Sequence, residues 1–168
     1  MADILHEIED AVPALRRYAR ALTRDLDRAD DLVQDCLERA ISRRRLFRPT
    51  GPVRPWLFTI LVNLYRNSLR GQRRRGETLD LSSIPEPAVP AAQPGHLALA
   101  ELARAIDTLP PEQKEALLLV TLEGLAYKEA ADILAIPLGT LMSRLGRARA
   151  TLKTLTGAPA EPHLRTVK

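Results

Sequence analysis

The sequence predicts an all-α fold made of two small helical domains that are joined by a proline-rich linker. Hydrophobic residues make up 45% of the 168 residues but aromatic residues only 4%, and Leu and Ala are prominent, which favours helices over a β-sandwich. Apolar residues recur at helical spacing on both sides of a stretch that holds four prolines between Gly76 and Gly95. The predicted division is a first domain over 1–76, a linker over 77–95, a second domain over 96–157 and a loose tail over 158–168.

Composition also limits the classes of function. A single cysteine, Cys36, excludes an internal disulfide framework, and the three histidines are too scattered to suggest a metal site with it. The N-terminal residues are acidic and lack the apolar core of a signal peptide, and no apolar run is long enough to span a bilayer. No nucleophile–base pair or glycine-rich phosphate loop is visible, so an enzyme is the least expected class. We expect a cytoplasmic protein that needs no metal or cofactor.

Two helices are predicted between Ala11 and Ala40, with a turn at Asp25–Asp27 between them. The second helix is expected to begin at Asp30 and to bury an apolar face that includes Cys36. Its other face carries an acidic stripe at positions i, i+3, i+4 and i+7, formed by Asp31, Gln34, Asp35 and Glu38. Capping and the helix dipole explain acids in the first turn, but they do not explain the last two members of the stripe.

Charge is segregated along the chain. Residues 1–38 carry ten acids, whereas the stretch between Glu38 and Glu77 has no acid and holds eleven arginines. A second acid-free window, 133–160, carries three arginines and a lysine. Two basic windows favour two contacts with a polyanion, and such binding would be salt-sensitive because counterions are released. The alternative for each window is a solvated surface, but the aromatic residues that lie among the first set of arginines favour stacking on bases as well.

The stretch Arg48–Pro55 is predicted to form a loop, because it contains three prolines and a glycine. A long apolar helix is expected to follow, from Trp56 to about Leu69, and to end at Gly71 before the arginine cluster 73–75.

Four helices are predicted in the second domain. Their expected ranges are His96–Thr108, Pro110–Leu122, Tyr127–Leu134, and a last helix that follows the turn 135–137 and ends near Leu155. The last two are short, joined by a tight turn, and the second of them is rich in Arg, which is typical of a DNA-binding helix-turn-helix. The expected buried face of the last helix consists of Leu141, Leu145, Ala148 and Leu152.

Five segments of the chain match the pattern of one protein family in the correct order. They are 30–40 (DDLVQDCLERA), 54–63 (RPWLFTILVN), 109–119 (LPPEQKEALLL), 122–131 (LEGLAYKEAA) and 136–149 (IPLGTLMSRLGRAR). Through them nearly the whole chain resembles the extracytoplasmic-function (ECF) RNA polymerase sigma factors, group 4 of the sigma-70 family. Any one segment is weakly specific, whereas the ordered set is specific. The resemblance implies a sigma region 2 helical bundle in the first domain and a sigma region 4 helix-turn-helix in the second.

The resemblance also implies roles for the candidate residues. The acidic stripe would bind core RNA polymerase through complementary charge. Recognition and melting of the −10 promoter element would rely on capture of a flipped base, without hydrolysis. The residues implied for this step are Phe47, Arg48, Arg54, Trp56, Asn63, Arg66 and Asn67. The residues implied for reading the −35 element in the major groove are Thr140, Met142, Ser143, Arg144, Arg147 and Arg149.

Several of these residues have a more specific expectation. Trp56 is expected to serve mainly as a core anchor that positions the loop. Arg147 could pair with a guanine, while Arg144 and Arg149 are expected to hold phosphates. An anti-sigma factor is the expected regulatory partner, because family members are often held by one.

The sequence departs from the family pattern within the helix-turn-helix. Ala126 stands where a capping Ser is common, Ala135 stands where Gly is common, and Gly146 lies inside the last helix. Met142 replaces a position that is frequently polar, which leaves the −35 preference open.

Two other functions remain possible on the sequence. The first is a sigma-like decoy that binds an anti-sigma factor without initiating transcription, although such a decoy would not need a basic recognition helix. The second is a stand-alone helix-turn-helix regulator, which would not need the acidic stripe or the loop of the first domain.

Overall fold

The computed structural model describes residues 2–47, 51–76 and 94–157. Within these ranges the chain forms helices and no strand. The elements are α1 (Ala2–Thr23), α2 (Leu26–Arg43), the 3₁₀ turn η1 (Arg44–Leu46), α3 (Val53–Arg74), α4 (Pro94–Asp107), α5 (Pro111–Thr121), α6 (Tyr127–Leu134) and α7 (Leu138–Thr156). The expected all-α fold is confirmed. Most of the predicted linker and the predicted tail lie outside the described residues.

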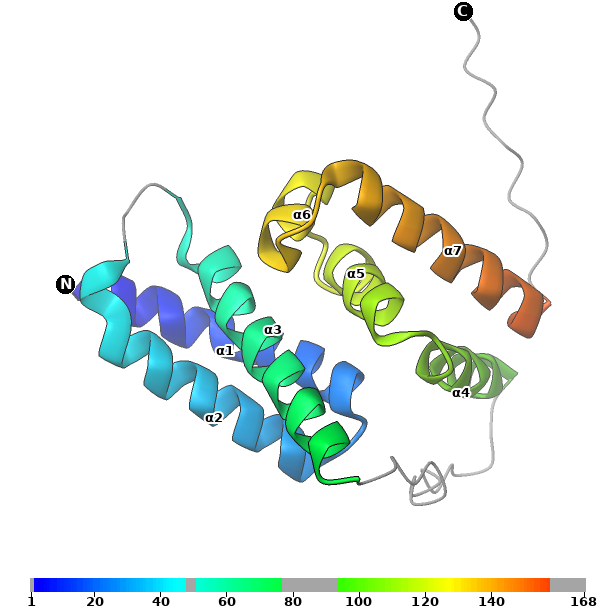
Figure 1. Cartoon of the computed structure of the whole chain (residues 1–168), viewed down its shortest axis with the longest axis horizontal. Helices are drawn as coiled ribbons and strands as arrows, with labels where there is room; N and C mark the ends of the chain where they lie inside the picture. The colour runs from blue at the N-terminus through cyan, green and yellow to red at the C-terminus, as the bar shows by residue number, and fades with distance from the viewer. Residues whose placement is uncertain (1, 48–50, 77–93, 158–168) are drawn as a thin grey trace, which may run out of the picture.

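The helices form two groups, which Figure 1 shows side by side: α1, α2 and α3 on the left, and α4 to α7 on the right. In the first group all three helices pack against one another. Large apolar side chains lie wholly buried between them, among them Leu15, Leu57 and Leu61. The rings of Tyr18 and Phe58 meet edge to face at a centroid distance of 5.3 Å, a favourable aromatic geometry.

The start of α2 differs from the expectation. The helix begins at Leu26 and not at Asp30, so the predicted turn at Asp25–Asp27 is shorter than expected. The physical reason is a cap: Asp25 has extended backbone angles, and its carboxylate accepts a hydrogen bond of 3.0 Å from the backbone N–H of Arg28. The acids that follow Asp25 therefore belong to the first turns of the helix, where their negative charge interacts favourably with the positive end of the helix dipole.

The start of α3 is a second correction. The sequence predicts a loop that ends at Pro55, but α3 begins at Val53 and includes Pro55 in its first turn. Proline is tolerated there because the first N–H groups of a helix have no acceptor within the helix. The helix also continues to Arg74, beyond the expected end at Leu69, and Gly71 lies inside it.

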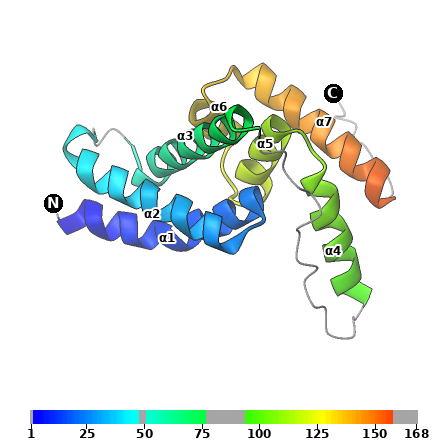
Figure 2. The same cartoon turned by 60° about the horizontal axis from the view of Figure 1, so that its bottom comes forward.

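In the second group the predicted helices are found with small shifts at their ends. The range of α6 is Tyr127–Leu134 as predicted, and α4 begins at Pro94, two residues before His96. On α7, Leu141, Leu145 and Ala148 are buried and Leu152 is partly buried, so the expected inner face is confirmed. Figure 2 shows α4 projecting away from α6 and at an angle to α7, with which it is in contact.

The two groups are in contact, and this determines where the candidate site residues lie. α1 packs against α5, and α3 packs against α6. The buried residues of both groups consequently form one continuous cluster. In Figure 1 this boundary runs between α3 on one side and α5 and α6 on the other.

Candidate functional site

The acidic stripe lies on the solvent-exposed face of α2. Asp31, Gln34, Asp35 and Glu38 are all exposed, and the amide of Gln34 donates a hydrogen bond of 3.1 Å to the Glu38 carboxylate. The opposite face packs on α1 and α3 and buries Cys36, whose thiol donates to the Leu57 carbonyl oxygen at 3.5 Å. Because only the apolar face holds the helix in place, the whole acidic stripe is available to a partner.

Two aromatic rings, one from the residue that follows η1 and one from the first turn of α3, pack against each other. Phe47 and Trp56 are both half-buried, and their ring centroids lie 5.0 Å apart at an angle of 44°. Both side chains also pack against the core. That Trp56 positions the loop stays a prediction, since residues 48–50 lie outside the described residues. Arg48, between the two rings in the sequence, lies outside the described residues.

Polar residues of α3 fall into two sets. Asn63 and Asn67 are exposed one helical turn apart, and the side-chain oxygen of Asn67 accepts a hydrogen bond of 2.6 Å from Arg70. Arg54 and Arg66 instead point toward the second group of helices. The structure thus does not bring the two arginines onto the same open surface as the two asparagines.

Arg66 forms a bidentate ion pair with Glu115 of α5. Its Nε and NH2 atoms donate to the carboxylate at distances between 2.7 and 3.2 Å, and its NH1 atom donates to the Leu134 carbonyl oxygen at 3.3 Å. Glu115 is only 2% exposed. The hydrogen bonds that Arg66 donates to Glu115 raise the pKa of Arg66, since they favour the charged guanidinium.

Glu123, in the turn after α5, holds two arginines of the first group. Its carboxylate accepts from the Nε and NH2 atoms of Arg17 at 3.0 and 2.7 Å, and from Arg54 NH2 at 2.9 Å. Arg54 NH2 also donates to the Glu123 carbonyl oxygen at 2.9 Å. Glu123 is 5% exposed, and its hydrogen bond raises the pKa of Arg17. One buried carboxylate therefore joins α1 and α3 to the second group of helices.

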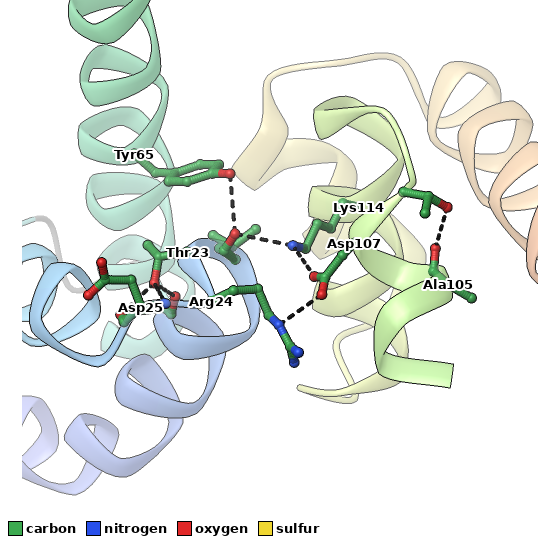
Figure 3. Close-up of polar contacts among 10 residues, drawn as sticks. Thr23, Arg24, Asp25, Tyr65, Ala105, Asp107 and Lys114 are labelled. Carbon is green, nitrogen blue, oxygen red and sulfur yellow. Dashed lines mark hydrogen bonds and ion pairs between the residues drawn. The ribbon is translucent and has the colours of Figure 1, made fainter. Parts of the chain in front are cut away.

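A third polar network, drawn in Figure 3, joins the end of α1 to α4 and α5. Asp107 forms ion pairs with Arg24 at 2.8 Å and with Lys114 at 3.0 Å. Lys114 also donates to the Leu22 carbonyl oxygen at 3.2 Å, and the Tyr65 hydroxyl donates to the same oxygen at 3.4 Å. Charged and hydrogen-bonding groups of α4 and α5 thus contact the C-terminal end of α1.

Our sequence reasoning missed the carboxylates of this interface. Glu115 lies four residues before Leu119, on the helical face that carries buried leucines. A charged residue on an apolar helical face indicates a buried ion pair, because an unpaired charge is rarely buried. That pattern does not identify the partner, which here comes from a distant part of the chain.

The candidate −35 residues lie on the outer side of α7. Met142, Ser143, Arg147 and Arg149 are exposed, and Thr140 and Arg144 are half-buried. The guanidinium of Arg149 donates to the Tyr127 hydroxyl of α6 at 3.2 and 3.3 Å. This contact links the two helices of the helix-turn-helix. Since the opposite face is buried, this surface can enter a groove without disturbing the core.

The departures from the family pattern have different structural consequences. Ala126 has no side-chain acceptor, but the Glu129 carboxylate accepts from its backbone N–H at 3.2 Å, so half of a capping box is kept. Ala135 has the left-handed backbone conformation, with φ 54° and ψ 46°, which is strained for an L-residue and explains why Gly is common there. Gly146 is exposed and nothing lies within 4 Å of a Cβ atom built on it.

Within the described residues, no helix combines the length and apolarity that a membrane span requires. Nor do those residues contain a group of three or more His, Cys, Asp or Glu side chains that could hold a metal ion.

Comparison with known proteins was consistent across sequence and structure. Residues 8–62 match the family described as the Sigma2 domain of PhyR, and residues 99–152 match Sigma-70, region 4. The ECF RNA polymerase sigma factor EcfG of Rhodopseudomonas palustris is 43% identical over 149 residues, which cover 89% of this chain and 82% of the relative.

Two solved structures share the arrangement of the helices. The sigma factor RpoE of Bartonella quintana, solved with the anti-sigma factor NepR, superposes with a TM-score of 0.81 at 34% identity, covering 95% of this chain and 100% of that one. CnrH, solved with the cytosolic domain of CnrY, gives a TM-score of 0.69 at 27% identity, covering 94% of this chain and 89% of that one. With both sigma regions matched in order along its length, this chain belongs to the family of ECF RNA polymerase sigma factors.

Proposed function

We propose that this protein binds core RNA polymerase and directs promoter-specific initiation of transcription. Residues 1–76 bind polymerase and recognise and melt the −10 element, residues 77–95 link the domains, and residues 96–157 recognise the −35 element. The observation that carries the proposal is that one chain exposes both an acidic stripe on α2 and an arginine-bearing surface on α7. A stand-alone helix-turn-helix regulator would not need the first of these surfaces.

The first domain does its work through binding energy alone. The acidic stripe docks on a basic surface of the polymerase, and complementary charge steers the encounter. Phe47 and Trp56 hold the two ends of the η1–α3 segment together, so that this segment can capture a base flipped from the non-template strand. Unstacking the base costs a few kcal/mol, which stacking and contacts to its edge offset.

The second domain places α7 in the major groove of the −35 element. Arg147 is exposed and has no partner among the described residues, so it can pair with guanine O6 and N7, which discriminates by about 1–3 kcal/mol. Arg144 and Arg149 hold phosphates and fix the register of the helix on the duplex.

An anti-sigma factor is the proposed regulatory partner. The supporting observation is that the RpoE structure, which superposes over nearly this whole chain, was solved with one. Since the polymerase works in the cytoplasm, the protein is proposed to act there, without a cofactor and without catalysing a reaction of its own.

A sigma-like decoy is the second candidate. The match of residues 8–62 to the Sigma2 domain of PhyR favours it, since PhyR has been described as an anti-anti-sigma factor. The exposed Arg147 and the half-buried Arg144 on α7 argue for a DNA-binding role instead, because a decoy has no phosphate to bind.

Transcription by the reconstituted polymerase separates the two candidates. The purified chain is mixed with core RNA polymerase and a library of promoter DNA, and transcripts are sequenced. We expect transcripts from a defined subset of promoters, and their loss when Arg144 and Arg147 are both replaced by Ala. Core polymerase alone is the control. Absence of any specific transcript, together with tight binding to an anti-sigma factor, would establish the decoy.

A further inference from the structure

The arginines of α3 that are assigned to the −10 element already have anionic partners within the chain. Arg66 is paired with Glu115, and Arg54 shares Glu123 with Arg17. Both carboxylates come from the second group of helices, and both are almost fully buried. Two buried carboxylates therefore occupy the guanidinium groups that the proposed function assigns to the promoter.

The Arg66–Glu115 pair has the geometry of phosphate recognition. A guanidinium binds a planar carboxylate or a phosphate through the same pair of parallel N–H donors. Arg66 uses its Nε and NH2 atoms on Glu115 in this bidentate manner, with the shortest distance 2.7 Å. A phosphate and Glu115 would thus need the same donors of Arg66, so the two are competitors.

The interface that the pairs hold together combines ion pairs and hydrogen bonds with the apolar cluster that both groups share. Interfaces between domains of one chain resemble those of transient complexes, so the two groups are able to move relative to each other. The side chains of Arg17 and Arg54 are 50% and 40% exposed. The Nε atom of Arg54 is buried without a hydrogen-bond partner among the described residues, and separation would let water satisfy it.

We propose that Glu115 and Glu123 form an intramolecular latch that inhibits DNA binding by the free chain. In the closed state they occupy Arg66 and Arg54, and these two arginines become available to DNA only when the α1–α3 group separates from the α4–α7 group. On separation water hydrates the two carboxylates, so the charges are not left buried. This proposal rests on the assignment of Arg54 and Arg66 to the −10 element.

The first test uses Arg17, which holds Glu123 but is not assigned to DNA. In the full chain, Arg17→Gln weakens the latch and removes one positive charge. Arg16→Gln is the matched control, because Arg16 is its exposed neighbour on α1, has no partner among the described residues and loses the same charge. Small-angle scattering gives the radius of gyration, and fluorescence anisotropy gives the affinity for mixed-sequence single-stranded DNA of about twelve nucleotides.

Simple electrostatics and the latch predict opposite results for Arg17→Gln. Loss of a positive charge alone should weaken DNA binding equally in both variants. The latch predicts a larger radius of gyration and a several-fold higher DNA affinity for Arg17→Gln than for Arg16→Gln. Circular dichroism checks that both variants keep their helices.

The second test removes both carboxylates. Glu115→Gln with Glu123→Gln should expand the chain and raise its DNA affinity further than the first variant does. Its control is Glu9→Gln with Glu101→Gln, two exposed positions with the same change of charge. The latch is wrong if the carboxylate variant stays as compact as its control. Expansion without tighter DNA binding would instead show that Arg54 and Arg66 do not bind the −10 element. In that case the latch would not inhibit DNA binding.

Discussion

Ala135 is the residue at which this chain stores backbone strain in its helix-turn-helix. It ends α6 with φ 54° and ψ 46°, a conformation that costs an L-residue about 1–2 kcal/mol relative to glycine, because Cβ approaches the following carbonyl oxygen. The residue is exposed, so its methyl group contributes little packing to offset this cost.

We predict that Ala135→Gly stabilises the protein by about 1 kcal/mol, measured as a shift in the urea midpoint at an unchanged slope. Ala150→Gly is the control: Ala150 is exposed inside α7, where glycine should destabilise by roughly 1 kcal/mol. A loss of stability in both variants would contradict the strain assigned to Ala135.

Buried groups that titrate at high pH give a second prediction at this scale. Burial raises the pKa of Cys36 from 9.0 to about 12 and that of Tyr65 from 10.0 to about 12. The unfolded chain therefore loses these protons first, and the native state is the better proton binder at alkaline pH. We predict full stability below about pH 9 and a decline in the melting temperature as the pH rises toward about 12.

Cys36→Ala identifies the contribution of the thiol to this decline. The variant should lose stability at neutral pH, because it leaves a small cavity, but its decline between about pH 9 and pH 10 should be shallower than that of the wild type. An identical slope in the two proteins would mean that the thiol titrates normally in the native state.

At the scale of single elements, α2 uses one face for packing and the opposite face for the proposed binding of polymerase. One face packs against α1 and α3, and the other presents the acidic stripe to solvent. Substitutions in the stripe can thus change binding without changing the core, which makes the assignment of α2 directly testable.

We predict that Asp35→Arg with Glu38→Arg lowers the affinity for core RNA polymerase roughly tenfold or more, since like charges across an interface cost several kcal/mol. Affinity for −35 DNA should be unchanged, because α7 is a separate element. Glu7→Arg with Glu9→Arg, on the exposed face of α1, is a control with the same change in net charge. Equal losses of polymerase affinity in both double variants would argue against the stripe.

At the scale of the whole molecule, three carboxylates hold the two groups of helices together. Asp107 differs from the two carboxylates of the latch, because one of its partners, Lys114, lies in its own group and the other, Arg24, lies in the first group. Groups that share one buried counter-ion contribute to stability non-additively.

A double-mutant cycle measures this coupling. We predict that Arg24→Met and Lys114→Met together destabilise the protein by an amount that differs from the sum of the single changes by about 0.5–3 kcal/mol, from urea unfolding. The double variant leaves Asp107 without either cation, whereas each single variant leaves one. The same cycle with Arg16 in place of Arg24 should be additive within error.

Local patterns predicted much of the fold. The helical spacing of apolar residues correctly predicted the buried face of α7, and the predicted range of α6 was correct. Both follow from interactions between residues that lie close together in the sequence. The starts of α2 and α3 were predicted too late, since Asp25 and Pro55 were interpreted as signs of a turn or loop. Both residue types are compatible with a helix at its N-terminus, and a local pattern does not separate the two positions.

The sequence by itself determined the helices, the exposed acidic stripe on α2, the exposed arginine-bearing surface of α7 and the family. Only the tertiary structure decided that Arg54 and Arg66 face Glu123 and Glu115 instead of solvent. The physical reason is the separation along the sequence over which each kind of interaction acts. Helical periodicity is set by neighbours three or four residues apart, whereas these ion pairs join residues far apart in the sequence whose meeting depends on how the two groups of helices dock.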